Sequence, residues 1–161
     1  MSHGVAFADI AAVLDTYFDG LHHSDTARLR RVFHPEARYH CATDGTLLTL
    51  DMPEYFRRVD ARPSPASQGH ARTDQVLAID LAGPVTAFAK VVCSIPPRHF
   101  IDFLTLVHLD GRWQIVAKVF HFTVQPAQTD PHGWESSVRG DHPLRPRGAL
   151  HEAGGTGSAG T

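Results

Sequence analysis

The sequence predicts an α+β fold in which a curved antiparallel sheet wraps around helices near the N-terminus. Apolar residues recur at helical spacing between residues 10 and 21. Runs rich in β-branched and aromatic residues, joined by short turns, occupy most of residues 72–124. Helices gathered before an antiparallel sheet are typical of α+β domains. A strongly curved sheet of this kind would form a cone with one open end.

Three helices are predicted from spacing and from capping residues. A helix over about residues 7–23 follows from a single apolar stripe. Asp25 is a suitable N-cap for a second helix over residues 26–33, and Asp51 for a third over residues 53–61. The stripe of the first helix consists of Ile10, Val13, Leu14, Tyr17, Phe18 and Leu21.

The strongest strand signal lies in residues 100–122, where two apolar runs flank an Asp-Gly pair at residues 110–111. Such a pattern is typical of a β-hairpin with a type I′ turn. Counting outward from the turn pairs Asp102 with Val119 and makes His121 its diagonal neighbour on the same face. A carboxylate on an otherwise apolar face is costly to bury without a partner. Asp102 and His121 are therefore the predicted chemical centre.

Two more turns extend the predicted sheet. An Asp-Gly turn at residues 44–45 places Tyr39 and Cys41 on one face. Pairing of Ile95 with Arg98 then places the small and apolar residues Ala87, Ala89, Val91 and Cys93 on the face of Asp102. The opposite, mixed face is expected to carry Phe88, Lys90, Val92, Phe103, Val116 and Lys118.

Composition excludes several classes of function. Lysine and arginine (15) nearly balance aspartate and glutamate (17), and basic residues do not cluster between aromatics, which argues against nucleic-acid binding. The sequence predicts no membrane span and no secretory leader, so a cytoplasmic protein is expected. Twelve histidines lack tight ligand spacing and the two cysteines are expected as buried thiols, so neither a metal nor a cofactor is predicted.

The chain changes character near residue 125. The segment 126–161 has no hydrophobic periodicity and is crowded with glycine and proline. Such composition is typical of a flexible tail. We therefore expect one domain over residues 1–125 followed by this tail.

Three stretches resemble a known superfamily. They are YFDGLHHSDTARLRRVFHPEA at 17–37, RPSP at 62–65 and FIDFLTLVHLDGRWQIVAKVF at 100–120. Together they resemble the NTF2-like superfamily, with its SnoaL-like and ketosteroid-isomerase-like cone fold, and within it the proteins described as putative lumazine-binding. The resemblance implies one pocket between the helices and the concave face of the sheet. It also implies a homodimer formed through the outer sheet face.

A candidate site combines the face assignment with the resemblance. Asp102 is the expected general base, His121 the proton relay and Tyr39 a phenolic hydrogen-bond donor. Each also has a structural interpretation: a paired carboxylate, a strand-end imidazole and a core aromatic. The resemblance and the burial pattern give candidate substrate-binding residues, which are Tyr17, Cys41, Phe56, Val91, Cys93, Leu104 and Trp113.

The expected function is cofactor-independent acid–base chemistry on a small apolar or aromatic metabolite. The superfamily includes isomerases, cyclases of the polyketide type, dehydratases and lyases, and also modules that only bind or assemble. A non-catalytic small-molecule binding protein and a dimeric assembly module therefore stay open as alternatives. Lys118 is expected on the outer face as a solvent or interface charge, and Arg38 and Arg58 either contact an anionic ligand or are solvated.

Overall fold

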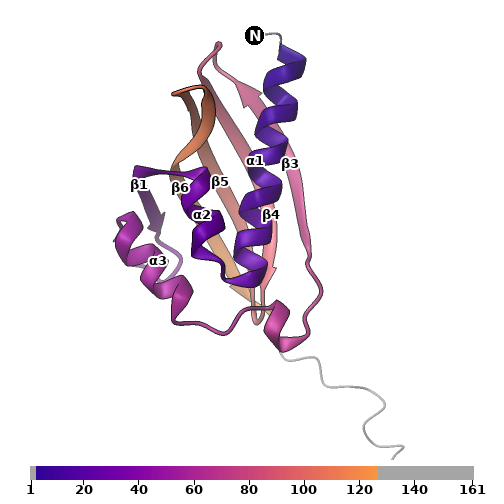
Figure 1. The fold of residues 1–161 in the computed structure, drawn as a ribbon. Coiled ribbons are helices and arrows are strands. Elements are labelled where there is room, and N and C mark those ends of the chain that lie inside the picture. The colour runs from indigo at the N-terminus through magenta and orange to yellow at the C-terminus, as the bar shows by residue number, and fades with distance from the viewer. Residues whose placement is uncertain (1–2, 127–161) are drawn as a thin grey trace, which may run out of the picture. The chain divides into compact units, whose positions relative to one another are not determined.

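The computed structural model describes residues 3–126, which form three α-helices, a short 3₁₀ turn and a six-stranded sheet (Figure 1). The helices are α1 (His3–His23), α2 (Thr26–Val32) and α3 (Met52–Asp60), and the 3₁₀ turn is Ala66–Gln68. The strands are β1 (Phe33–Cys41), β2 (Leu48–Leu50), β3 (Asp74–Leu81), β4 (Thr86–Ile95), β5 (Arg98–Leu109) and β6 (Arg112–Val124). The predicted tail at residues 126–161 lies almost wholly outside the described residues and stays a prediction.

The strands are ordered β2-β1-β6-β5-β4-β3. All neighbours pair antiparallel except β1 and β6, which run parallel. The helices lie against one face of the sheet (Figure 1). This arrangement confirms the predicted α+β class. The parallel pair arises because β1, which pairs with β2 on one side, joins β6 of the late hairpin on its other side. No described helix is long and apolar enough to cross a membrane.

Local capping explains where α2 and α3 begin. The Asp25 carboxylate accepts a hydrogen bond from the backbone N–H of Arg28 at 3.1 Å, and the Asp51 carboxylate accepts from the N–H of Glu54 at 2.9 Å. Each bond satisfies a backbone donor that has no partner inside the helix. Both predicted caps are confirmed. Helix α2 ends one residue before the prediction, because Phe33 already belongs to β1.

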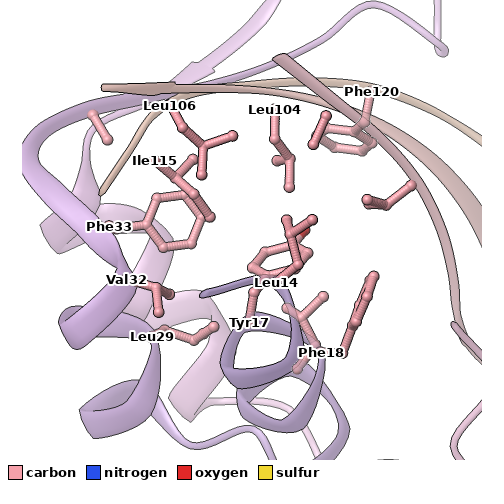
Figure 2. Close-up of a cluster of buried hydrophobic side chains, with 14 of the residues drawn as sticks. Leu14, Tyr17, Phe18, Leu29, Val32, Phe33, Leu104, Leu106, Ile115 and Phe120 are labelled. Atoms are coloured by element: carbon pink, nitrogen blue, oxygen red, sulfur yellow. The ribbon is translucent and has the colours of Figure 1, made fainter. Parts of the chain in front are cut away.

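The apolar stripe of α1 packs onto the sheet. Figure 2 shows Leu14, Tyr17 and Phe18 facing side chains of β5 and β6, with Leu29 and Val32 of α2 beside them. Leu14, Tyr17 and Leu29 are completely buried. Burial of this stripe holds α1 across the concave face.

Gly20 marks the closest approach of α1 to α2. A Cβ atom added at Gly20 would lie 2.7 Å from Cδ2 and 2.9 Å from Cγ of the buried Leu29. Alanine favours the helix by about 1 kcal/mol, but overpacking of a core costs about 1–3 kcal/mol. We expect Gly20→Ala to lower the free energy of unfolding by about 1 kcal/mol in urea titrations. Gly4→Ala, in the same helix with nothing within 4 Å of the added Cβ, is the matched control and should be neutral or stabilising.

The predicted turns are present. Asp110 and Gly111 both have positive φ, at 53° and 76°, as a type I′ turn requires. The registers counted from the turns at 44–45 and at the β4–β5 connection are confirmed, with Tyr39 opposite Leu50 and Ile95 opposite Arg98. Asp102 accordingly lies on the buried face, opposite Val91 of β4.

The register of the β5–β6 hairpin changes beyond Leu106. From the turn to the pair Leu106–Ile115 the strands follow the predicted register, but Thr105 then pairs with Ala117, leaving Val116 as an extra residue on β6. Such a bulge reverses the alternation of faces along the strand that contains it. The predicted pairing of Asp102 with Val119 is therefore wrong, since Asp102 lies opposite Phe120.

The bulge exchanges the faces of the last residues of β6. Lys118 and Phe120 point inward and are buried, whereas Val119 and His121 are exposed on the outer face. The predictions that Lys118 lies on the outer face and that His121 lies beside Asp102 are both wrong for this reason. The outer face is otherwise mixed, as predicted, with Phe88 and Phe103 in ring contact at 5.4 Å. The homodimer through this face stays a prediction.

Candidate active site

A hydrogen-bonded network of three side chains lies between α1 and the sheet. The Tyr17 hydroxyl donates to Oδ2 of Asp102 at 2.7 Å. The Lys118 ammonium donates to the same Oδ2 at 3.1 Å and to the Tyr17 oxygen at 2.6 Å. Tyr17 and Asp102 are completely buried, and Lys118 is 3 % exposed. A salt bridge with an additional phenol is thus enclosed in the core.

Each member reaches the network through a different local feature. Tyr17 belongs to the buried stripe of α1, and Asp102 points inward by the alternation of β5. Lys118 points inward only because of the bulge at Val116. The Cys93 thiol of β4 lies 3.7 Å from Oδ2 of Asp102 and completes the immediate surroundings.

Aromatic rings enclose the charge of Lys118. Its Nζ lies 5.0 Å from the ring centroid of Phe120, 5.2 Å from that of Tyr17, and 5.7 Å from those of Tyr39 and Phe100. Cations are attracted to the faces of such rings. Burial lowers the pKa of Lys118. The attraction of Asp102 is the largest of several opposing effects, which together outweigh burial and hold this pKa above its ordinary value of 10.5. Lys118 is therefore an ammonium at neutral pH.

The neighbouring phenols and thiol stay protonated at neutral pH. Burial, followed by the charge of Asp102, raises the pKa of Tyr17 well above its usual value and raises that of the Cys93 thiol. Burial raises the pKa of Tyr39 to about 12, although Lys118 opposes this shift. Tyr17 and Tyr39 are hence hydrogen-bond donors, and Cys93 is a thiol and not a nucleophilic thiolate. Both cysteines are free and buried, as the sequence predicted.

Some buried polar atoms have no hydrogen-bond partner among the described residues. They include Oδ1 of Asp102 and the hydroxyl of Tyr55. Buried polar groups are normally paired, so each unpaired one calls for a reason. Oδ1 keeps its lone pairs available to accept a proton, and the Tyr55 hydroxyl can donate to a bound molecule.

A cavity of about 440 Å³ lies next to this network. Tyr39 and Phe120 belong to its lining and also surround Lys118, so these two rings separate the cavity from the ion pair. The volume is in the range of small-molecule sites. The lining consists of Tyr39, Cys41, Asp44, Thr46, Leu48, Leu50, Tyr55, Arg58, Val59, Arg62, Arg98, Phe120 and Phe122.

The structure brings most of the predicted site residues together. Tyr39 and Cys41 line the cavity, and Tyr17 contacts Asp102 directly. The predicted binding residues of the sheet lie around the network: Val91 opposite Asp102, Leu104 opposite Lys118, and Cys93 against the carboxylate.

Three predicted residues lie elsewhere. His121 is on the outer face, with its Nδ1 3.1 Å from the Thr43 hydroxyl. Phe56 lines a different hollow of about 270 Å³, between α2 and α3. Trp113 lies near the hairpin turn, in ring contact with His108 at 5.3 Å.

Several residues of the site were missed by sequence analysis. Lys118 was assigned to the wrong face, and no local signal marks the bulge that turns it inward. Tyr55 lies on the buried side of α3, where the apolar periodicity together with a tyrosine hydroxyl could have suggested a pocket donor. Arg62 and Arg98 lie at loop and strand ends, where sequence does not reveal which side chains converge. Within residues 3–126 no group of three or more histidine, cysteine, aspartate or glutamate side chains is placed to hold a metal ion.

Comparisons with known proteins agree with this architecture. The model of a family described as "Putative lumazine-binding" matches residues 6–121. The chain is 29 % identical over 126 residues to the protein named aldolase FrzH from a Cladobotryum species, a match that covers 75 % of this chain and 97 % of the relative.

Solved structures support the same fold. An NTF2-like protein from Silicibacter pomeroyi DSS-3 superposes with a TM-score of 0.68 at 23 % identity, covering 76 % of this chain and 100 % of the other. An NTF2-like protein from Shewanella baltica OS155 superposes with a TM-score of 0.69 at 23 % identity, covering 76 % of this chain and 98 % of the other. The fold is therefore NTF2-like, with helices packed against a mostly antiparallel sheet.

Proposed function

The chain belongs to the Putative lumazine-binding family, and from this membership and its buried ion pair we propose that it is an acid–base enzyme acting beside a carbonyl group. The reaction we propose is of the aldol type, making or breaking a carbon–carbon bond in a small apolar or aromatic molecule. The observation that carries the proposal is the enclosed Asp102–Lys118 pair next to the 440 Å³ cavity.

A buried ion pair is a poor device for stability alone. Removing two charges from water costs several kcal/mol per ion, and apolar residues of similar shape usually serve a core at least as well. Within residues 3–126, Oδ1 of Asp102 also has no hydrogen-bond partner, although a purely structural network would normally satisfy such an atom. A carboxylate in apolar surroundings is suited to removing a proton next to a carbonyl.

The proposed chemistry needs only proton transfers. Asp102 takes a proton from the carbon next to the substrate carbonyl, and the electrons of that C–H bond form an enolate. The enolate carbon then attacks a second carbonyl carbon, the new C–C bond forms, and the resulting alkoxide takes the proton back. The reverse sequence cleaves the same bond.

The positive charge of Lys118 would stabilise the enolate oxygen, assisted by a hydrogen bond from the Tyr55 hydroxyl. Tyr55 lines the cavity and its hydroxyl is without a partner among the described residues. Preorganised donors and charges of this kind are commonly the largest single contribution to catalysis. The rings of Tyr39 and Phe120 must move for a substrate to reach Asp102, since they lie between the cavity and the ion pair.

The relative named aldolase FrzH supports the aldol assignment over the other reactions of the superfamily. Some aldolases use a lysine that forms an iminium with the substrate, which requires an uncharged amine. In this chain the attraction of Asp102 keeps the pKa of Lys118 above 10.5, so the amine is protonated. Lys118 is proposed here as a fixed positive charge.

A fluorogenic retro-aldol substrate tests this proposal. We expect the protein to release fluorescent naphthaldehyde from a naphthyl β-hydroxyketone, and borohydride added during turnover should leave the mass of Lys118 unchanged. A borohydride-fixed adduct on Lys118 would show iminium chemistry in place of the acid–base mechanism. Binding of the ketone with no aldehyde release would contradict an aldol enzyme.

A non-catalytic binding protein is the second candidate, favoured by one observation. Asp102, Lys118 and Tyr17 lie behind the cavity wall and are not part of the lining. A ligand could then occupy the cavity without touching the ion pair. Binding without turnover in the assay above, unaffected by substitutions in the pair, would support this candidate.

A further inference from the structure

We infer that the cavity recognises a small aromatic molecule that carries a carboxylate or a phosphate. The inference rests on the proposed function only in taking the cavity as the substrate site, and it names the class of substrate. It is carried by three arginines that converge on an aromatic cavity.

Positive charge predominates in the lining. Arg58 comes from α3, Arg62 from the segment that follows α3, and Arg98 from the start of β5. Against these three guanidinium groups, the part of the lining formed by residues 3–126 contains a single carboxylate, that of Asp44. Residues from separate parts of the chain thus bring an excess of positive charge to one opening, which favours an anion.

Within residues 3–126, two of the arginines have no carboxylate partner. Arg58 is held by Glu54, with 3.0 Å between Nε and the carboxylate oxygen. Among the described residues, the Arg62 side chain donates one hydrogen bond, from Nε to the Ser24 hydroxyl at 3.4 Å, and its Nη2 is buried without a partner. Arg98 has no carboxylate within 4.0 Å in residues 3–126, and its guanidinium lies 4.5 Å from the centre of the Phe122 ring.

An unpaired buried guanidinium N–H is costly, and a carboxylate or phosphate oxygen is the acceptor that best satisfies it. The planar fork of arginine matches both anions with two parallel hydrogen bonds. Stacking on Phe122 also limits the freedom of Arg98, so less entropy is lost when a ligand binds. Arg62 and Arg98 are therefore the proposed anion contacts.

The rest of the lining suits a flat apolar body. Tyr39 and Tyr55 stack with ring centres 4.8 Å apart and 29° between their planes. Phe120 lies tilted against Tyr39 at 4.6 Å, and Phe122 belongs to the same lining. Aromatic pairs of this geometry add favourable contacts with a bound ring. The ligand would place its ring here and its anionic group toward the arginines.

Matched ligands test the inference without requiring turnover. Calorimetry would compare naphthylacetate, naphthyl phosphate and the neutral naphthaleneacetamide. We expect at least one anion to bind about tenfold more tightly than the amide, the effect of a charge-assisted hydrogen bond at a partly exposed site. The preferred anion identifies carboxylate or phosphate as the natural group. Equal affinity of all three, or no binding of any, would overturn the inference.

Substitutions of single arginines show which side chains cause the preference for an anionic ligand. Arg62→Gln and Arg98→Gln should each remove most of the preference for the anion, while affinity for the amide stays within about twofold. Arg31→Gln is the matched control, because Arg31 is exposed on α2 and does not belong to the lining. A preference that survives both substitutions would overturn the inference. Failure of the aldol assay would leave this result unaffected, since binding at equilibrium does not depend on catalysis.

Discussion

Replacing Lys118 with methionine is expected to lower the free energy of unfolding by about 3–5 kcal/mol, because the carboxylate of Asp102 stays buried without its counter-charge. Methionine keeps the unbranched shape of the lysine side chain, so loss of packing contributes little. Urea unfolding at neutral pH measures the change. The matched control is Lys90→Met. Lys90 is a partly exposed lysine of β4 on the outer face of the sheet, so the free energy of unfolding of this variant should stay within about 0.5 kcal/mol of the wild-type value.

A triple variant separates two quantities: the destabilisation caused by breaking the ion pair, and the net contribution of the intact pair to the free energy of unfolding. Tyr17→Phe, Asp102→Leu and Lys118→Met together replace the whole network by apolar side chains of similar shape. We expect this variant to unfold within about 2 kcal/mol of the wild type, because no buried charge is left unpaired. If the triple variant is as unstable as Lys118→Met alone, the network is a requirement of the fold and the argument for a functional role fails.

The alkaline limb of stability gives a second readout for the same residues. The pKa of Lys118 is raised in the folded state, so its contribution is fully present below its ordinary pKa of 10.5 and is lost as the pH rises through the folded value. Tyr17 behaves alike, since its pKa is also raised by folding, from 10.0. As the pH rises from these ordinary pKa values toward the folded-state values, the free energy of unfolding of the wild type should fall by up to about 1.4 kcal/mol per pH unit for each group. The triple variant should lose correspondingly less.

Replacing Asp102 with asparagine is expected to lower kcat of the retro-aldol assay by about a thousandfold, the scale of a lost general base. The amide keeps the shape of the carboxylate but cannot accept a proton. Tyr17→Phe should cost about a hundredfold, because Asp102 and Lys118 lose the phenol that joins them. The unfolding transition of each variant, measured in the same buffer, shows whether the fold persists during the assay.

His121→Ala discriminates between the two interpretations of the site. If His121 were the proton relay predicted from the unbulged register, this substitution would lower kcat substantially. Because His121 is exposed on the outer face, we expect kcat to stay within about twofold of the wild type. A large loss would indicate that the outer face contributes to the reaction, and the Asp102-centred mechanism would then be wrong.

Local signals in the sequence were sufficient for the elements of the fold. The stripe from Ile10 to Leu21 predicted α1, and the Asp25 and Asp51 caps predicted the starts of α2 and α3. The Asp-Gly turns predicted the registers next to them. These features depend on residues that are close in sequence, where backbone geometry leaves few alternatives. The inward direction of Asp102 was predicted in the same way, by the alternation of faces along β5 counted from the Asp110-Gly111 turn, because the bulge lies on β6 and not on β5.

The chemical partner of Asp102 could not be predicted in this way. The sequence pointed to His121, and the structure places Lys118 there instead. One extra residue at Val116 causes the difference, and a bulge is decided by how β6 fits against β5 and β1 at once. Its position has no local signature, because the apolar residues around it suit either face.

By itself, therefore, the sequence determined the helices, the hairpins, the α+β class and an inward carboxylate at Asp102, since these follow from short-range periodicity and turn chemistry. Only the tertiary structure decided that Lys118 shares the core with Asp102, that β1 lies parallel to β6, and that Arg62 and Arg98 meet at one cavity. Those features join residues distant in sequence, and their positions depend on the packing of the whole sheet against α1, where a single added residue exchanges the two faces of a strand.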